Sequence, residues 1–256
     1  MNLDAYFTRI GWRGGRDASP HTLAGLLEHH MRAIPFENLD VLLGRPPRLA
    51  LDALEAKLVH ARRGGYCYEH STLFAAVLRE LGHEVHAHSA RVIMVTPREA
   101  APRTHMFLTV GDAVLDPGFG GQAPVMPVPR DGTPTATHRF VRDGADHVLE
   151  MREGVAWKRL WASSLERDLP IDFEMANHFT ATFPTSPFVN RLMARALTPD
   201  GKVAIANRDV TIVRGGDTRT FQLADRRELR ALLAESFGFD LPEVEALRVP
   251  TVPEWT

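Results

Sequence analysis

The spacing of apolar residues changes once along the chain, near Val85, and this change constrains the fold more than any other feature. Before Val85, apolar residues recur every three or four positions, which predicts helices over 19–34 and 51–59 and from Cys67 to Gly82. After it, β-branched and alternating residues predict strands at 85–95, 104–110, 113–116 and, more weakly, within 137–162. The pattern therefore favours a helical first part followed by an antiparallel sheet or barrel.

The last part of the chain mixes both patterns. Segments 210–213 and 218–223, joined through a glycine pair, predict a β-hairpin. A helix should follow, because Asp225 and Glu228 have capping-box spacing and Gly238 can end it. The chain therefore ends in a small unit of mixed helix and strand.

Composition excludes several functional classes. The formal net charge is -2, so the surface has no single-sign field that would attract polyanions, and we expect no nucleic-acid partner. No run approaches the roughly 18 apolar residues that a membrane span needs. The first residues also lack the apolar core of a signal peptide. We therefore expect no membrane partner and a cytoplasmic location.

The single cysteine, Cys67, either fills the core or carries chemistry, because one thiol cannot form an internal disulfide. It follows Arg62, Arg63 and two glycines, and it stands at the start of a predicted helix, ahead of the apolar stripe. The helix dipole and nearby cations favour the thiolate there, and free N–H groups of the first turn can receive an oxyanion. We predict that Cys67 is a nucleophile.

A partner base is predicted at His105. A two-residue turn at Gly111 and Asp112 would pair Val110 with Ala113, which places Asp116 diagonally opposite His105 on one sheet face. A loop longer by one residue would move Asp116 to the other face. With Cys67 upstream, the three residues form a set in which Asp116 orients His105 and His105 accepts the thiol proton.

The other histidines support weaker hypotheses. His70, three positions after Cys67, is a second candidate base, although no acid is evident to orient it. His86 and His88 share a strand face, but no third ligand has convincing spacing, so we expect no metal site. His30 and His60 fall where helix surfaces are expected.

Several segments of this chain resemble the arylamine N-acetyltransferases. The resemblance is carried by IPFENLD at 34–40 and RGGYCYEH at 63–70, and it continues with LDAYF at 3–7 and GFGG at 118–121. It implies ping-pong transfer of an acetyl group from acetyl-CoA to an aromatic amine or hydrazine. Acetyl-CoA would be a co-substrate, and no cofactor would stay bound.

The resemblance also implies site residues and an architecture. Cys67, His105 and Asp116 fall on the family's catalytic triad. Phe36 and Phe119 would line the acceptor pocket, and Gly120 and Gly121 would border the coenzyme. The pattern alone instead favours Phe36 as a core residue, while Phe119, between glycines, is the better pocket candidate.

The implied fold is α+β, with the Cys-His-Asp arrangement of cysteine proteases at its core. We place a helical domain at 1–84, a β-barrel domain at 85–185 and a small α/β lid at 186–256. Two positions depart from the family's usual residues, Ser71 and Pro117, and the proline should end its strand directly after Asp116.

Alternatives share the same residue types. An amide synthase of macrolactam biosynthesis would take its acyl group from a carrier protein. A papain-like or transglutaminase-like thiol enzyme would use the same three residues on other amides. The papain pattern around the cysteine is absent from this sequence. A binding module without catalysis is the remaining possibility.

Overall fold

The three helices that the apolar spacing predicts in the first third are present, whereas α1 (Leu3–Ile10) and α3 (Leu39–Leu42) were not predicted. The computed structural model describes residues 1–255. Ser19 caps α2 (Pro20–Ala33), its Oγ accepting the N–H of Thr22 at 3.2 Å, with Pro20 at the first helical position. The other helices of the first third are α1 (Leu3–Ile10), α3 (Leu39–Leu42), α4 (Leu51–Leu54), which continues as η1 (Glu55–His60), and α5 (Cys67–Glu80).

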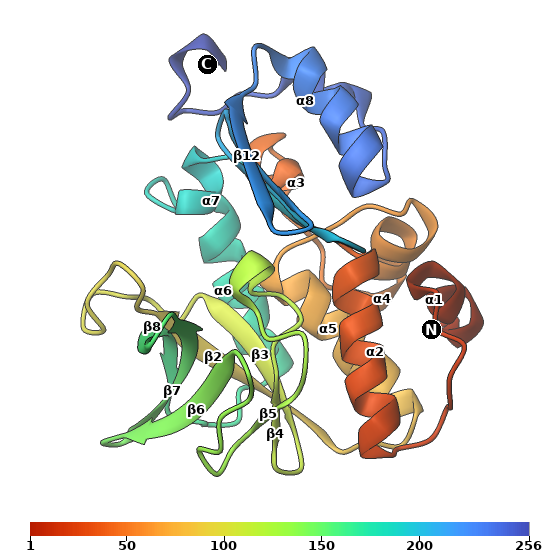
Figure 1. Ribbon diagram of the computed structural model, residues 1–256, viewed down its shortest axis with the longest axis vertical. Helices are drawn as coiled ribbons and strands as arrows, with labels where there is room; N and C mark the ends of the chain where they lie inside the picture. Colours follow the sequence, from red (N-terminus) through yellow and green to blue (C-terminus); the bar gives the residue numbers. More distant parts are fainter. Residues whose placement is uncertain (256) are drawn as a thin grey trace.

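Seven antiparallel strands form a nearly closed barrel in the middle of the chain (Figure 1). Their spatial order is β5, β4, β3, β2, β8, β7 and β6, and the end strands β5 and β6 lie in contact. The strands are β2 (Val85–Val92), β3 (His105–Val110), β4 (Ala113–Leu115), β5 (Val128–Pro129), β6 (His138–Asp143), β7 (Asp146–Glu153) and β8 (Ala156–Ser163).

The predicted register of the first hairpin is confirmed. Val110 pairs with Ala113 and Leu108 with Leu115 across a two-residue turn. β4 ends at Leu115, so Asp116 lies just beyond the last paired residue and ahead of Pro117, which has no N–H to donate to a ladder. The fold class is therefore α+β. The residues of the β3–β4 hairpin also face the sides of the sheet that we expected from counting residues.

A second antiparallel sheet has the order β1, β9, β10, β11 and β12. Its bounds are β1 (Phe36–Glu37), β9 (Met193–Thr198), β10 (Gly201–Ala206), β11 (Asp209–Arg214) and β12 (Asp217–Gln222). Gly215 and Gly216 join the last two strands with positive φ angles of 57° and 94°, as a two-residue hairpin requires. The predicted hairpin is thus present, whereas β1, β9 and β10 were not predicted.

Helices and short turns complete the chain. α6 (Pro170–Thr182) and α7 (Pro187–Asn190) link the two sheets, and Asp225 caps α8 (Arg226–Leu232) by accepting the N–H groups of Arg227 and Glu228. The helix continues as η3 (Leu233–Phe237) and ends at Gly238, which has a φ of 78°. The remaining turns are η2 (Gly120–Gln122), η4 (Pro242–Ala246) and η5 (Pro253–Trp255).

The domain division stays a prediction. β1 belongs to residues 1–84 but pairs with β9, where Phe36 faces Arg195. α6 lies within 85–185, yet its Phe173 and Ala181 join the helical core rather than the interior of the barrel. β1 and α6 therefore each pack against residues of another proposed domain.

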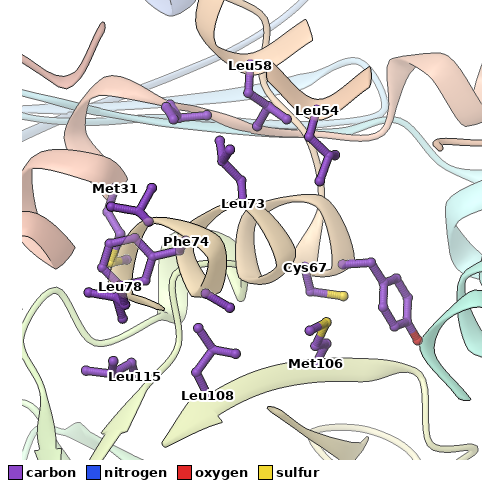
Figure 2. Packing of buried hydrophobic residues seen from close by; sticks show 14 of the residues in the cluster. Met31, Leu54, Leu58, Cys67, Leu73, Phe74, Leu78, Met106, Leu108 and Leu115 are labelled. Atoms are coloured by element: carbon purple, nitrogen blue, oxygen red, sulfur yellow. The ribbon is translucent and has the colours of Figure 1, made fainter. Parts of the chain in front are cut away.

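The largest core cluster holds α5 between helices and the barrel. Figure 2 shows Leu73 pointing from α5 toward Leu54 and Leu58, while Leu108 and Leu115 lie against the opposite face of the helix. A shift of this helix along its axis would disturb the packing on both of its faces. Because protein interiors are close-packed, such a disturbance would reduce the stability of the fold. The packing therefore fixes Cys67, the first residue of α5, relative to β3.

One histidine departs from expectation. We expected His30 on a helix surface, but its side chain is fully buried. Its Nδ1 lies 2.8 Å from the hydroxyl of Tyr6 and its Nε2 lies 2.9 Å from Nδ1 of His70. Burial lowers the pKa of His30, so the neutral ring serves as a hydrogen-bonded core residue.

Candidate active site

Cys67 is placed by the hydrogen bonds at the start of α5. Glu69 accepts the N–H of Tyr66 at 3.1 Å through Oε2 and the ammonium of Lys57 at 2.8 Å through Oε1. A Cβ at Gly65 would come within 2.6 Å of that Oε2, so the chain approaches the carboxylate only because residue 65 is glycine. The thiol is 3% exposed and stands where N–H groups of the first turn lack intrahelical partners.

The two arginines before the thiol do not act as we expected. Arg63 is buried, with Nη2 2.6 Å from Glu37 and 3.2 Å from Asp40, so its charge is balanced by these carboxylates. Arg62 is exposed. The positive groups on the side of the thiol are instead the helix start and the residues that share its cavity, His105 and Arg195.

His105 and Asp116 meet as the strand parity predicts. Nε2 of His105 lies 3.0 Å from Oδ2 of Asp116, and both side chains are buried. The indole N–H of Trp161 donates to the same oxygen at 2.8 Å. The carboxylate is therefore held by two groups from different strands.

The Nδ1 side of the His105 ring is available to the sulfur of Cys67. With Nε2 occupied by Asp116, Nδ1 is the nitrogen left to interact with Cys67, which lines the same cavity as His105. Cys67 Sγ also lies 3.8 Å from the carbonyl oxygen of Thr104. Burial disfavours the imidazolium, but Asp116 and Cys67 outweigh this and raise the pKa of His105 to about 10. The protonated ring favours a thiolate beside it.

His70 cannot serve as the alternative base in this geometry. Its Nδ1 is bonded to His30, and its Nε2 lies 3.2 Å and 3.1 Å from the carbonyl oxygens of Pro35 and Gly65. Burial outweighs those bonds and lowers the pKa of His70 to about 4. The ring therefore ties α2 and the loop before Cys67 to α5, and both of its nitrogens are already engaged.

A cavity of about 240 Å³ opens on the thiol and on His105. Phe36 and Phe119 both line it, and the Phe119 ring centroid lies 4.8 Å from that of His105. Within residues 1–255, no aspartate or glutamate is among the residues that line the cavity. An apolar ring can enter this space, while an ammonium group would lose hydration without gaining a partner.

Gly120 and Gly121 line a neighbouring cavity of about 210 Å³. Phe36 and Arg195 line both cavities, so the two spaces adjoin. A Cβ at Gly118 would lie 2.5 Å from Cα of Cys67, which shows how closely this loop packs on the cysteine.

His86 and His88 on β2 do not form a metal site with a third ligand within residues 1–255. His88 is engaged on both nitrogens, at 2.8 Å from the carbonyl oxygen of Glu166 and 2.9 Å from the hydroxyl of Thr109. No group of three or more histidine, cysteine, aspartate or glutamate side chains in residues 1–255 could hold a metal ion. None of the helices in the same range is long and apolar enough to cross a membrane.

Comparisons with known proteins identify the family of this chain. The N-acetyltransferase family model matches residues 21–246. The curated arylamine N-acetyltransferase of Mycobacterium tuberculosis is 37% identical over 258 residues, which cover 95% of this chain and 91% of that protein. The chain belongs to the arylamine N-acetyltransferase family.

Other arylamine N-acetyltransferases are similarly close. The Escherichia coli enzyme is 36% identical, with 95% of this chain and 90% of that protein covered. The solved M. tuberculosis structure superposes with a TM-score of 0.88 at 36% identity, covering 95% and 96% of the two chains. The Mycobacterium marinum enzyme, solved in complex with CoA, gives 0.88 at 35% identity, covering 95% and 94%.

Two residues at the site of this arylamine N-acetyltransferase family member were missed in the sequence. Trp161 lies on β8, and a buried indole N–H needs a partner, but the sequence does not reveal that the partner is Asp116. Arg195 lies on β9, where its neighbours Ala194 and Ala196 are buried. An arginine between buried alanines was the available signal, because it must face away from the core.

Proposed function

We propose that this chain transfers an acetyl group from acetyl-CoA to aromatic amines or hydrazines through a thioester on Cys67. The observation that carries the proposal is the buried chain of contacts from Cys67 through His105 to Asp116, open to an apolar cavity. The family membership supports the same chemistry. The relatives give no support to the amide-synthase or papain-like alternatives.

In the first half-reaction, the Cys67 thiolate attacks the acetyl carbonyl carbon of acetyl-CoA. The first-turn N–H groups of α5, which lack intrahelical partners, would receive the developing oxyanion. As the carbon–sulfur bond to the coenzyme breaks, protonated His105 gives its proton to the departing CoA thiolate. The products are free CoA and acetyl-Cys67, with His105 neutral.

In the second half-reaction, a neutral aromatic amine attacks the thioester carbon. His105 accepts a proton from the amine nitrogen as the new carbon–nitrogen bond forms. Cys67 then leaves as a thiolate, and the imidazolium is regenerated beside it. In both half-reactions, Asp116 stabilises the protonated ring of His105 and fixes the tautomer of its neutral form.

The remaining residues would shape the two substrate positions. Phe36 and Phe119 would contact the aromatic ring of the acceptor, since both line the cavity next to Cys67. Gly120 and Gly121 would border the coenzyme from the adjoining cavity. We further propose that the enzyme acts in the cytoplasm, where a lone thiol stays reduced.

Intact mass measurement tests the proposal. Acetyl-CoA should add one acetyl group to the wild-type protein, and an added aniline should remove it while acetanilide forms. Cys67→Ala should fold and take up no acetyl group. Acetylation of a lysine, or no acetylation of the wild-type protein, would contradict the thioester mechanism.

A further inference from the structure

Three buried side chains form a hydrogen-bonded chain that the acetyl-transfer steps do not use. The hydroxyl of Tyr6 on α1 lies 2.8 Å from Nδ1 of His30 on α2, and Nε2 of His30 lies 2.9 Å from Nδ1 of His70 on α5. Nε2 of His70 then faces the carbonyl oxygens of Pro35 and Gly65 at 3.2 Å and 3.1 Å. All three side chains are at most 1% exposed. The Tyr6–His30–His70 chain therefore links the neighbouring helices α1, α2 and α5 (Figure 1) to two carbonyl groups outside them.

The two carbonyl groups determine where the protons of this chain lie. Carbonyl oxygens only accept hydrogen bonds, so Nε2 of His70 carries the proton and its Nδ1 is an acceptor. His30 must then donate from Nε2 and accept the hydroxyl proton of Tyr6 at Nδ1. Both rings are neutral in this arrangement. Burial favours that state, because it lowers the pKa of His30 well below its ordinary value and the pKa of His70 to about 4.

His70 holds the two residues that immediately precede the thiol. Its backbone N–H donates to the carbonyl oxygen of Tyr66 at 3.1 Å, while its ring donates to the carbonyl oxygen of Gly65. The N–H of Tyr66 is in turn bound by Glu69. Because Cys67 follows directly, the position of its backbone depends on these hydrogen bonds.

His30 and Tyr6 reach this region only through His70. Neither is among the residues in 1–255 that line the cavity with Cys67 or the adjoining cavity, whereas His70 lines the adjoining one. A neutral ring without the N–H of His30 at its Nδ1 is free to carry its proton there, and it then loses both bonds to the carbonyl groups. The partner on α2 therefore keeps His70 in the tautomer that holds the start of α5.

We propose that the Tyr6–His30–His70 chain positions Cys67 for its reaction, by keeping His70 in the tautomer that binds the carbonyl group of Gly65. Its three members are positioning residues, because they act on the reacting sulfur through the backbone before it. The inference rests on the proposed role of Cys67 as the nucleophile. Placement matters there, since a shift of about 1 Å at a reacting group can cost roughly 100-fold in rate.

The test removes the links one at a time and follows the acetylation of Cys67 by acetyl-CoA in a single turnover. His30→Leu should lower the rate at saturating acetyl-CoA roughly 10- to 100-fold and change the half-saturating concentration less than about 2-fold. Tyr6→Phe keeps the aromatic ring and removes only the first donor, so its loss of rate should be smaller. It gives the same comparison if His30→Leu does not fold.

Substitution of His70 itself provides a rescue experiment. His70→Gln should keep most of the rate, since its amide can donate to the carbonyl groups and accept from His30. His70→Leu can do neither and should lose rate at least as strongly as His30→Leu. A role in bulk stability alone would not separate these variants at a temperature where all of them are folded.

His29→Leu is the matched control. His29 is the neighbour of His30 on α2 and also contacts α1, with Nδ1 3.1 Å from the carbonyl oxygen of Ile10, but it is not part of the chain. Leu229→Ala, in the core of the C-terminal part, controls for a loss of stability alone. Both variants should acetylate Cys67 at the wild-type rate, although Leu229→Ala should lower the melting temperature.

The remaining outcomes would overturn the proposal or the function on which it rests. Wild-type rates in His30→Leu and Tyr6→Phe would show that the chain supports only the fold. An equal loss in His29→Leu or Leu229→Ala would attribute the effect to stability, and a raised half-saturating concentration at an unchanged rate would attribute it to coenzyme binding.

Reaction of Cys67 with iodoacetamide separates the two levels of the argument, because it needs no coenzyme. A wild-type protein that takes up no acetyl group would refute the proposed function. Alkylation should still be slower in His30→Leu than in His29→Leu if the chain positions the thiol, and equal alkylation rates would overturn the positioning role.

Discussion

Trp161 donates its indole N–H to the oxygen of Asp116 that also faces His105, at 2.8 Å and 3.0 Å respectively. The other oxygen of Asp116 is buried and has no hydrogen-bond partner within residues 1–255. One oxygen therefore carries both hydrogen bonds of the carboxylate, one with His105 and one from Trp161, so the orientation of the carboxylate depends on an aromatic side chain from β8.

Trp161→Phe should slow the acetylation of Cys67 by roughly 10-fold or more, because a carboxylate that rotates no longer holds His105 in place. The loss of a hydrogen bond to a buried charge should also reduce the free energy of unfolding by about 1–3 kcal/mol. Single-turnover kinetics and urea denaturation measure the two effects. Trp157→Phe, on the same strand but packed against Arg139, is the control and should affect neither. An unchanged acetylation rate in Trp161→Phe would show that Asp116 keeps its orientation without the hydrogen bond from Trp161.

His105 should couple stability to pH. The raised pKa, about 10 in the folded state against 6.5 for a free histidine, means that the folded protein binds this proton more tightly. The stabilisation is fully present below pH 6.5 and is lost as the pH rises through 10. We therefore expect the stability difference between wild type and His105→Gln to be largest below pH 6.5 and to shrink toward pH 10.

Urea denaturation across that range measures the difference. His60→Gln is the control, since His60 is 60% exposed and lies at the end of η1, away from the site. Its stability relative to wild type should not follow the same pH course. A difference between wild type and His105→Gln that stays constant from pH 6.5 to 10 would contradict the ion-pair interpretation.

Gly118→Ala should displace Cys67. The added Cβ would lie 2.5 Å from Cα and 3.0 Å from the carbonyl oxygen of Cys67, so the loop or the helix start must move. We expect a loss of about 1–3 kcal/mol in the free energy of unfolding and slower acetylation of Cys67. Gly15→Ala is a milder control, because its Cβ would meet only side-chain atoms, those of Thr22 at 3.1 Å and of Asp17 at 3.2 Å. Wild-type kinetics in Gly118→Ala would show that the loop is free to adjust.

Acceptor choice should follow the charge of the amine. Aniline is neutral at pH 7, whereas cyclohexylamine, of similar size, is an ammonium ion. The thiol cavity is lined mostly by apolar residues together with Arg195 and His105, and no acidic residue within 1–255 lines it, so burial of an ammonium there would be unfavourable. Aniline should turn over acetyl-Cys67 well above the rate of hydrolysis, and cyclohexylamine should not. Equal turnover of both amines would remove the arylamine assignment.

Local patterns in the sequence were sufficient for several elements and for the pairing at the site. Ser19 and Pro20 mark the start of α2, and Gly215 and Gly216 define a hairpin, because caps and tight turns depend on a few adjacent residues. The distance from His105 to Asp116 along a hairpin is short enough that counting residues settles which face they share. Cys67 was recognisable as a candidate nucleophile because it precedes an apolar stripe.

Only the tertiary structure decided what surrounds those residues. Arg63 is neutralised by Glu37 and Asp40, His30 is buried against Tyr6, and Trp161 reaches Asp116 from a strand 45 positions away. These partners come from segments distant in sequence, and their side chains meet only when sheets and helices pack. A local pattern states that a residue is buried or polar. Which group satisfies its hydrogen bond or its charge depends on the three-dimensional packing of the whole chain.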